Sequence, residues 1–256
     1  RILALLPEGR QNLLFSATLS PEVRSLASNF LHHPASVDVA PTISAAESVE
    51  QVAYLVDADR KRELLAFLVR SRDLHQVLVF TRTKQMTRRL AAQLDRDGVE
   101  ATAIHGDRTQ PERERALEMF KAGEVRVLVA TDVAARGLDI EALPVVVNFE
   151  IPFDPEDYVH RIGRTGRAGM EGLAISLVSL DEEEQLKSIN RLLKRDLPVR
   201  QVRGFEVDTS ARAARAGVRS GRSGRLAGAG RGDRPGPDGA RRRASGGSGR
   251  RGAAAD

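Results

Sequence analysis

The sequence predicts an α/β protein in which helices flank a parallel sheet. Short runs rich in β-branched and apolar residues alternate with longer amphipathic segments, which is typical of βα units. The segments between the runs are expected to be helices. The runs that we expect to be strands are residues 11–17, 48–56, 76–81, 100–105, 125–131, 144–150 and 173–179.

Several expected helices carry signals for where they begin or end. Pro21 and Pro111 stand early in two of them, where the missing N–H costs little. The segment 83–98 closes on Gly98, a residue suited to a helix C-cap. Residues 181–195 place acidic side chains first and basic side chains last, which complements the helix dipole.

A break in the alternation of strands and helices divides the chain. Residues 40–48 are small and polar and include a proline, which is typical of a linker. Residues 1–39 hold too few elements to fold alone and are expected to be the end of an incomplete first domain. Residues 49–205 are long enough for a complete α/β domain, and residues 206–256 form a tail.

The tail carries the excess positive charge of the chain. The net charge is +5, yet residues 211–256 alone contain twelve arginines and three aspartates, together with twelve of the 22 glycines. Such a segment cannot bury enough apolar surface to offset its ordering entropy, so we expect it to be disordered. Two interpretations stay open for it: an electrostatic arm for nucleic-acid phosphates, or a tail that only promotes solubility.

The composition excludes several kinds of chemistry. The chain has no cysteine, which excludes disulfides, iron–sulfur clusters, cysteine-ligated zinc and thiol catalysis. No apolar run approaches the roughly 18 residues of a membrane span, and no signal segment opens the chain, so we expect a soluble, cytoplasmic protein. Because the chain begins with Arg1 and its methionines are all internal, we expect it to be a fragment of a longer reading frame.

Four polar motifs follow expected strands at the points where these strands end. They are SAT at 16–18, FTRTK at 80–84, HGDR at 105–108 and ATDVAARGLD at 130–139. The carboxyl ends of parallel strands share one edge of a sheet, where open α/β sheets bind ligands, and the motifs offer hydroxyl, glycine and arginine groups suited to phosphate. Taken singly, each has a plainer interpretation: a helix N-cap for SAT, a structural role for His105, or turns for the glycines.

The motif HRIGRTGR is harder to explain by structure alone. On a helix, Arg161, Arg164 and Arg167 would align as like charges, and Gly163 and Gly166 would weaken the helix. At a helix end, planar guanidinium forks can each bind two phosphate oxygens. We therefore interpret the motif as a grip on phosphate.

Five motifs of the chain occur together in one known family. SAT, VLVFTRTK, IHGDRTQPERERAL, VLVATDVAARGLDI and YVHRIGRTGRAG, in this order, closely resemble the second half of the bacterial DEAD-box ATP-dependent RNA helicases of superfamily two. The resemblance covers residues 1 to about 205 and implies a RecA-like helicase C-terminal domain preceded by a remnant of a first RecA-like domain. ARGLD together with HRIGRTGR favours this family over the DEAH-type helicases and over RecQ-like DNA helicases.

The resemblance implies a nucleotide site for ATP and Mg²⁺. Arg164 and Arg167 look like arginine fingers that reach the γ-phosphate, where such a group stabilises charge in the transition state. Asp139 resembles the acid that accepts a hydrogen bond from the ribose, and Gly137 would let the backbone come close to the nucleotide.

The resemblance also implies coupling and RNA binding. His160 and Arg161 look like couplers between the nucleotide site and the SAT segment, which contributes Ser16 and Thr18. Contacts to phosphates and 2′-hydroxyls would bind RNA without reading its sequence. The residues that resemble such contacts are Thr83, Gly106, Arg108 and Thr131.

The motifs make up half of an ATP site. No GxxxxGK[ST] loop and no Asp-Glu-Ala-Asp tetrapeptide occurs in the 256 residues, so we expect both, with the Mg²⁺ ligands, on a domain that precedes Arg1. No metal site is expected in the chain itself. Two hypotheses follow: the longer protein is an ATP-driven RNA-duplex unwinder, and the chain by itself is a non-catalytic RNA-binding module. In the chain alone, the arginines of HRIGRTGR are expected to face solvent, unengaged.

Overall fold

The computed structural model describes most of the chain up to Asp208. The chain divides into two units, Arg1–Thr209 and Ser210–Asp256, and every described residue belongs to the first. The expected linker at 40–48 and the tail beyond Asp208 lie outside the described residues, so the expected domain boundaries and the disorder of the tail stay predictions. The described residues are 6–7, 9–16, 21–37, 49–136, 140, 142–166 and 171–208.

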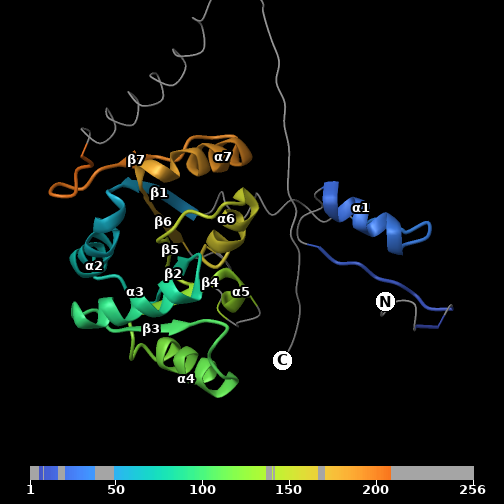
Figure 1. Cartoon of the computed structure of the whole chain (residues 1–256), viewed down its shortest axis with the longest axis horizontal. Coiled ribbons are helices and arrows are strands. Elements are labelled where there is room, and N and C mark those ends of the chain that lie inside the picture. Colours follow the sequence, from blue (N-terminus) through green and yellow to red (C-terminus); the bar gives the residue numbers. More distant parts are fainter. Residues whose placement is uncertain are drawn as a thin grey trace, which may run out of the picture. The chain divides into compact units, whose positions relative to one another are not determined.

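The described residues form a parallel sheet of seven strands (Figure 1). The strands lie in the order β3-β4-β2-β5-β6-β1-β7, and each neighbouring pair is parallel. All carboxyl ends of the strands therefore lie at the same edge of the sheet. The strands are β1 (Val49–Leu55), β2 (Val77–Thr81), β3 (Ala101–Ile104), β4 (Val127–Thr131), β5 (Val145–Asn148), β6 (Gly172–Val178) and β7 (Val199–Arg200).

Helices connect the strands and cover both faces of the sheet. Each connection carries the chain from the carboxyl end of one strand to the amino end of the next, as parallel pairing requires. None of the described helices is both long and apolar enough to cross a membrane. The helices are α1 (Pro21–Phe30), α2 (Lys61–Ser71), α3 (Lys84–Arg96), α4 (Gln110–Lys121), α5 (Asp132–Ala135), α6 (Pro155–Ile162) and α7 (Glu183–Leu193), with 3₁₀ turns η3 (Ala58–Arg60) and η4 (Leu180–Glu182).

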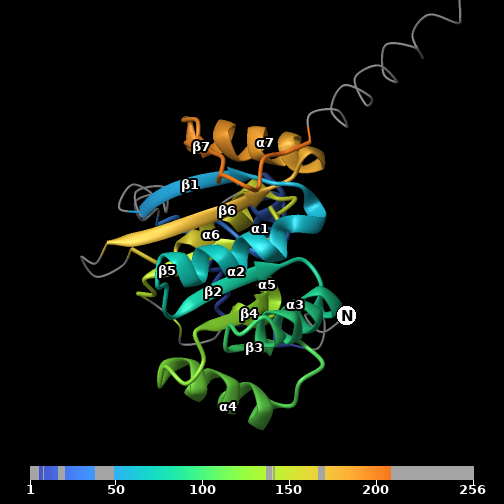
Figure 2. The same ribbon diagram turned by 90° about the vertical axis from the view of Figure 1, so that its left-hand side faces the viewer.

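Alternation along the strands divides the core into two layers. In β2, Val77 and Val79 pack with α2 and α3, whereas Leu78 and Phe80 pack on the opposite face with α4 and α5. Helices α6 and α7 cover that second face beside β1 and β6. Figures 1 and 2 show α2 and α3 together on one side of the sheet. The central strands are buried on both faces, which explains their continuous apolar sequences.

Six of the seven expected strands are confirmed, and the first is wrong. Residues 11–16 are irregular, and Leu13 and Phe15 are exposed. A strand is stabilised by pairing with neighbours, and none of the described strands pairs with this segment. The short strand β7, which pairs with β1, was not predicted because two residues after Pro198 give no periodic pattern.

The expected helix signals are confirmed where the structure describes them. Helix α1 begins at Pro21, and Pro111 lies in the first turn of α4. Helix α3 is followed by Gly98 with φ 78°, the left-handed conformation that suits glycine. Helix α7 has acidic residues in its first turn and a basic residue in its last.

Candidate functional site

Three of the predicted motifs converge at the carboxyl edge of the sheet. Thr131 ends β4, Thr83 follows β2, and Gly106 and Arg108 follow β3. Strand β4 lies between β2 and β3, so the loops after these strands are neighbours. The structure therefore brings together the four residues that were predicted to contact RNA.

The two predicted threonines each cap a helix. Thr83 Oγ1 accepts a hydrogen bond from the Met86 N–H at 3.1 Å, and Thr131 Oγ1 accepts one from the Ala134 N–H at 3.3 Å. Each hydroxyl keeps its own proton to donate, so capping does not prevent a contact with a phosphate or ribose oxygen. The N-terminus of α3, where Thr83 lies, also carries the positive end of the helix dipole.

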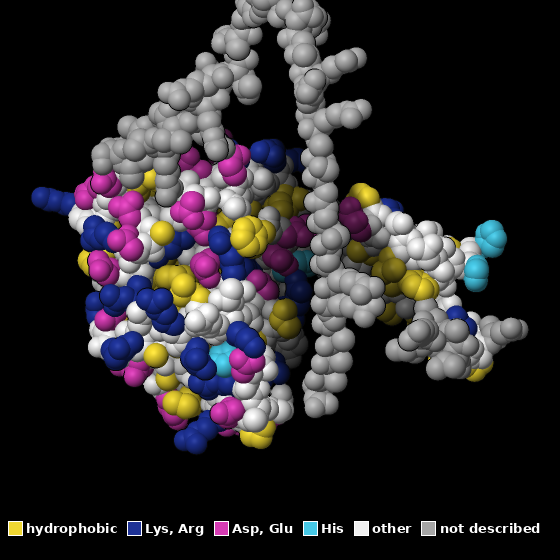
Figure 3. Space-filling model, viewed as in Figure 1, with side chains coloured by type: hydrophobic (Ala, Val, Ile, Leu, Met, Phe, Trp, Pro, Cys, Tyr) yellow, Lys and Arg dark blue, Asp and Glu magenta, His cyan; other side chains and the backbone are white. Residues whose placement is uncertain are grey.

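Cationic side chains surround the loop that follows β3. Lys84 forms an ion pair with Asp107 at 2.7 Å, and this contact lowers the pKa of Asp107. Arg88 and Arg108 lie close enough to His105 to affect its ionisation. Figure 3 shows Lys and Arg side chains gathered over α3 and the neighbouring loops. This surface, which we call the β3 face, is defined by Thr83, Lys84, Arg88, His105, Gly106, Arg108 and Thr131.

His105 is buried beneath the β3 face. Its exposed fraction is 5%, and its Nδ1 atom has no hydrogen-bond partner among the described residues. Burial lowers the pKa of His105, and the positive charge of Arg108 acts in the same direction. The imidazole is therefore neutral at neutral pH, and it supports the loop rather than adding a charge to it.

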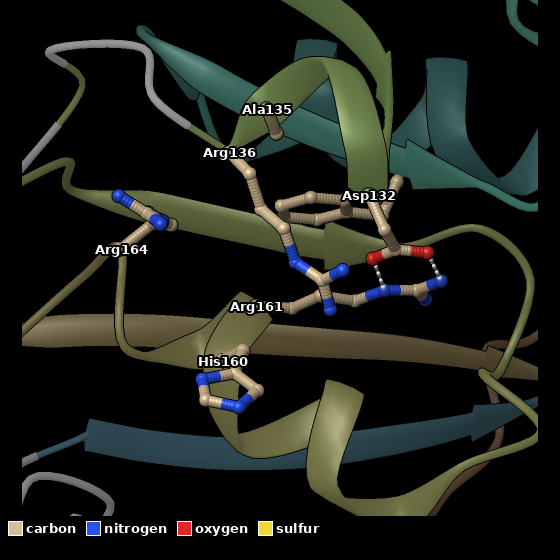
Figure 4. Close-up of a pocket in the computed structure, with 7 residues that line it drawn as sticks. Asp132, Ala135, Arg136, His160, Arg161 and Arg164 are labelled. Atoms are coloured by element: carbon tan, nitrogen blue, oxygen red, sulfur yellow. Dashed lines mark hydrogen bonds and ion pairs between the residues drawn. The ribbon is translucent and has the colours of Figure 1, made fainter. Parts of the chain in front are cut away.

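A second polar region lies between α5 and α6 and forms a small, shallow pocket (Figure 4). Figure 4 shows Asp132 and Arg161 bonded side to side, with His160 and Arg164 projecting from the end of α6 and from the segment beyond it. Arg136, at the end of α5, reaches toward the same space and pairs with Asp157 at 2.6 Å. We call this region the arginine pocket.

Arg161 is buried inside the domain, which contradicts the expectation that it faces solvent. Its exposed fraction is 2%. Nε and one terminal nitrogen donate to the two carboxylate oxygens of Asp132 at 2.6 and 2.7 Å, and the other terminal nitrogen donates to Asn148 Oδ1 at 3.1 Å and to the Glu150 carbonyl at 2.7 Å. The guanidinium also lies 5.1 Å from the centre of the Phe80 ring. A charge so fully bonded positions β4, β5 and α6 relative to one another.

Arg164 differs from Arg161 in its burial because helix α6 ends between them. Helix α6 stops at Ile162 and is capped by Gly163, so the three-residue spacing does not stack the two arginines. Arg164 is half-buried and lines the arginine pocket. Arg164 also has an interaction partner, so the expectation of an unengaged side chain is wrong for Arg164 as well.

The backbone around Arg164 is held against the sheet. The Leu143 N–H donates to the Arg164 carbonyl at 3.0 Å, and the buried Thr165 hydroxyl donates to the Leu143 carbonyl. A Cβ atom on Gly172 would lie 2.3 Å from the Gly166 nitrogen. Only glycine at position 172 allows this close approach, which fixes where Arg164 emerges.

Comparison with known proteins agrees with this geometry. Residues 59–169 match the family described as the helicase conserved C-terminal domain. The crystal structure of the E. coli DEAD-box protein SrmB bound to RraA is 35% identical, with a TM-score of 0.60, and the match covers 63% of this chain and 95% of that one. The chain belongs to the DEAD-box family of RNA helicases.

Other DEAD-box relatives are longer than this chain. ATP-dependent RNA helicase RhlB of Pseudomonas putida is 46% identical over 188 residues, which are 73% of this chain and 47% of RhlB. The helicase CshA of Bacillus cereus is 44% identical over 196 residues, 77% of this chain and 37% of CshA. The S. cerevisiae Dbp5 structure bound to RNA and ADP BeF3 is 29% identical, with a TM-score of 0.69, covering 85% of this chain and 57% of Dbp5. The chain thus spans about half, or less, of the length of the curated relatives.

Four of the predicted DEAD-box site residues lie outside the described residues. They are Thr18, Gly137, Asp139 and Arg167, and their roles stay predictions. Ser16 is described and lies in an irregular segment, where its coupling role is likewise untested.

Sequence reasoning missed the partners that hold Arg161. Asp132 directly follows Thr131, the last residue of β4. An acidic residue at the carboxyl end of a strand could have been recognised as a candidate site residue. Asn148 and Glu150 gave a weaker signal: an amide and an acid at the end of an apolar strand that is otherwise valine and phenylalanine. Arg136, inside ATDVAARGLD, was also not singled out.

The described residues contain no cluster arranged as a metal site. Among these residues, no group of three or more histidine, aspartate or glutamate side chains could hold a metal ion. Three arginines line the arginine pocket, and the carboxylate among its lining residues, Asp132, is already bonded to Arg161.

Proposed function

We propose that this chain is the C-terminal part of an ATP-dependent RNA helicase that unwinds RNA duplexes. In this proposal, the chain contributes the RNA-backbone contacts of the β3 face and the phosphate-binding arginines of the arginine pocket, and another domain completes the ATP site. The observation that supports it most is the placement of both regions on one sheet, with the Asp132–Arg161 pair at the end of β4 joining them. The names of RhlB and CshA support the same activity class.

The β3 face has the chemistry expected for RNA binding without sequence specificity. Thr83 and Thr131 offer hydroxyls, Arg108 offers a guanidinium, and Gly106 leaves open space above the backbone, because a Cβ atom there would meet nothing within 4 Å. These groups suit phosphate oxygens and 2′-hydroxyls rather than base edges. The structure of Dbp5, a relative solved with RNA, is consistent with this ligand class.

The arginine pocket has the chemistry expected for a transferring phosphate. Arg164, and Arg167 three residues later, would meet the γ-phosphate of ATP, while Gly137 and Asp139 would contact the nucleotide. Bound Mg²⁺ would neutralise charge on the phosphate oxygens. The buried Arg161 has a different part in this proposal: it holds α6, and therefore His160 beside it, in place through Asp132.

The chain by itself is expected to bind RNA without hydrolysing ATP. This second function is favoured by the lack of a GxxxxGK[ST] loop and of a DEAD tetrapeptide in the sequence. RNA-stimulated ATP hydrolysis by the purified 256 residues would contradict it.

The test of the proposal is RNA binding by the chain and by one matched pair of arginine variants. Arg108→Ala should weaken binding of a labelled single-stranded RNA about tenfold and reduce the salt slope by about 0.7, because one phosphate contact is lost. Fluorescence anisotropy at several salt concentrations measures both.

The control is Arg200→Ala, on the exposed strand β7 at the far edge of the sheet. It should leave RNA affinity unchanged, and both variants keep the same tail. Equal losses of RNA affinity from Arg108→Ala and Arg200→Ala would reject the β3 face as the RNA surface. Binding of DNA of the same sequence should be weaker, because it lacks the 2′-hydroxyls.

A further inference from the structure

A buried ionic cluster lies at the carboxyl edge of the sheet, outside both the β3 face and the arginine pocket. It consists of Lys61, Arg82 and Glu182. The side chains of Lys61 and Glu182 are each 4% exposed, and that of Arg82 is 23% exposed. None of these residues has a part in the proposed function.

Both carboxylate oxygens of Glu182 are occupied by donors. One oxygen accepts from Arg82 and from the Ile151 N–H at 3.3 Å. The other accepts from Lys61, from the Ser179 N–H at 3.2 Å and from the Ser179 hydroxyl at 3.1 Å. A single carboxylate therefore receives five hydrogen bonds.

These donors come from four adjacent strands. Lys61 follows β1 at the start of α2, Arg82 follows β2, Ile151 follows β5, and Ser179 follows β6. The strands β2, β5, β6 and β1 are consecutive neighbours in the sheet. Glu182 thus ties together the carboxyl ends of four strands.

Arg82 is held at more than one point. Its Nε donates to the Ile151 carbonyl at 2.9 Å, its backbone N–H donates to Glu150 at 2.8 Å, and its guanidinium lies 4.4 Å from the centre of the Phe153 ring. The next residue is Thr83, the cap of α3 and a proposed RNA contact. The ionic cluster therefore fixes the backbone from which Thr83 projects.

Stability alone is a poor explanation for this cluster. Burying an ammonium and a carboxylate costs solvation, and apolar side chains of similar volume are often equally or more stabilising in such places. Desolvation lowers the pKa of Lys61 despite the adjacent Glu182 carboxylate, which shows how far the cluster is removed from water. What the charged cluster provides, and apolar packing would not, is a directional hold on Arg82.

We propose that Glu182 is a positioning residue for RNA binding, because it anchors Arg82 and through it sets the position of Thr83 at the start of α3. The inference rests on the proposed function of this edge as an RNA surface. Glu182 itself does not touch RNA in this account.

The test replaces the buried pair by apolar side chains and compares it with an exposed pair. Lys61→Met/Glu182→Met should weaken binding of labelled single-stranded oligouridine about tenfold, since small misplacements of a binding group are costly. The urea midpoint should fall less than for Glu182→Met alone, because the double substitution leaves no buried Lys61 ammonium without its partner. The control, Lys187→Met/Glu184→Met, removes an exposed ion pair of 2.8 Å on α7 and should change neither quantity.

Two further measurements separate positioning from a general loss of structure. Arg82→Lys keeps a positive charge opposite Glu182 but cannot reproduce the fork of hydrogen bonds, so RNA affinity should fall several-fold, about threefold or more, even if the Met variant does not fold. In a Thr83→Ala background, the effect of Arg82→Lys on RNA affinity should largely disappear, because the residue that it positions has already been removed.

Failure of this inference and failure of the proposed function would give different results. RNA affinity within about twofold of the unsubstituted chain for Arg82→Lys, or a full additional loss in the Thr83→Ala background, would overturn the inference and leave the proposed function intact. Absence of RNA binding by the unsubstituted chain would overturn the proposed function, and this inference with it.

Discussion

The arginine pocket and the β3 face are both built from motifs at strand ends, but they use their charges in opposite ways. In the arginine pocket, Arg161 is buried and bonded to Asp132, Asn148 and the Glu150 carbonyl. On the β3 face, the cations lie at the surface around a loop whose only buried polar side chain, among the described residues of that face, is His105.

The difference shows that arginines of predicted phosphate-binding motifs need not all have the same role. A buried and fully bonded guanidinium donates its hydrogen bonds to groups of the protein, so its contribution is to hold helices and strands in place. A surface guanidinium keeps donors for a ligand. Arg161 and Arg164, three residues apart, differ in burial because α6 ends between them: Arg161 is buried, and Arg164 is half-buried where it lines the arginine pocket.

The largest expected effect comes from one substitution made in both regions. Arg161→Met should lower the free energy of unfolding by about 3 kcal/mol, because it leaves Asp132 without its partner in a partly buried place. Arg108→Met on the β3 face should change it by less than about 0.5 kcal/mol. Urea denaturation measures both. Similar losses for the two variants would show that the regions do not differ in the way described.

A smaller effect is expected from a second matched substitution. Gly172→Ala should destabilise the domain by about 1–3 kcal/mol, because the new Cβ would lie 2.3 Å from the Gly166 nitrogen. Gly106→Ala meets nothing within 4 Å and should leave stability within about 0.5 kcal/mol while weakening RNA binding. Thermal unfolding and RNA anisotropy distinguish the two. A stable Gly172→Ala variant would mean that the segment carrying Arg164 is not held as described.

The strand pattern and the motifs were predictable because each depends on local sequence. Continuous apolar runs such as the one ending at Thr81 have few alternatives to a central parallel strand. The motif residues Thr83, Gly106, Arg108 and Thr131 were then placed at one edge by the geometry of parallel strands alone. The structure places these residues on neighbouring loops at that edge, and their role in binding RNA stays a proposal.

The burial and bonding of individual site residues could not be predicted, because they depend on partners elsewhere in the fold that the sequence does not show. The spacing of HRIGRTGR does not predict that Arg161 is buried more fully than Arg164. The difference comes from Asp132 at the start of α5, from Asn148 at the end of β5 and from the end of α6 at Ile162. The strand expected at 11–17 failed for the same reason, because a strand forms only where neighbours pair with it. Glu182 was hidden in an acidic run that reads as a helix N-terminus.

In the proposed function, Arg164 faces the γ-phosphate of ATP while the β3 face binds RNA. The most direct test is Arg164→Ala in a helicase in which this chain follows a complete first domain, with ATP turnover and RNA affinity measured side by side. RNA-stimulated kcat should fall about 10³-fold, as for loss of an arginine finger, while the RNA Kd should change less than about threefold. Turnover that survives the substitution, or an RNA Kd that rises as much as kcat falls, would contradict it.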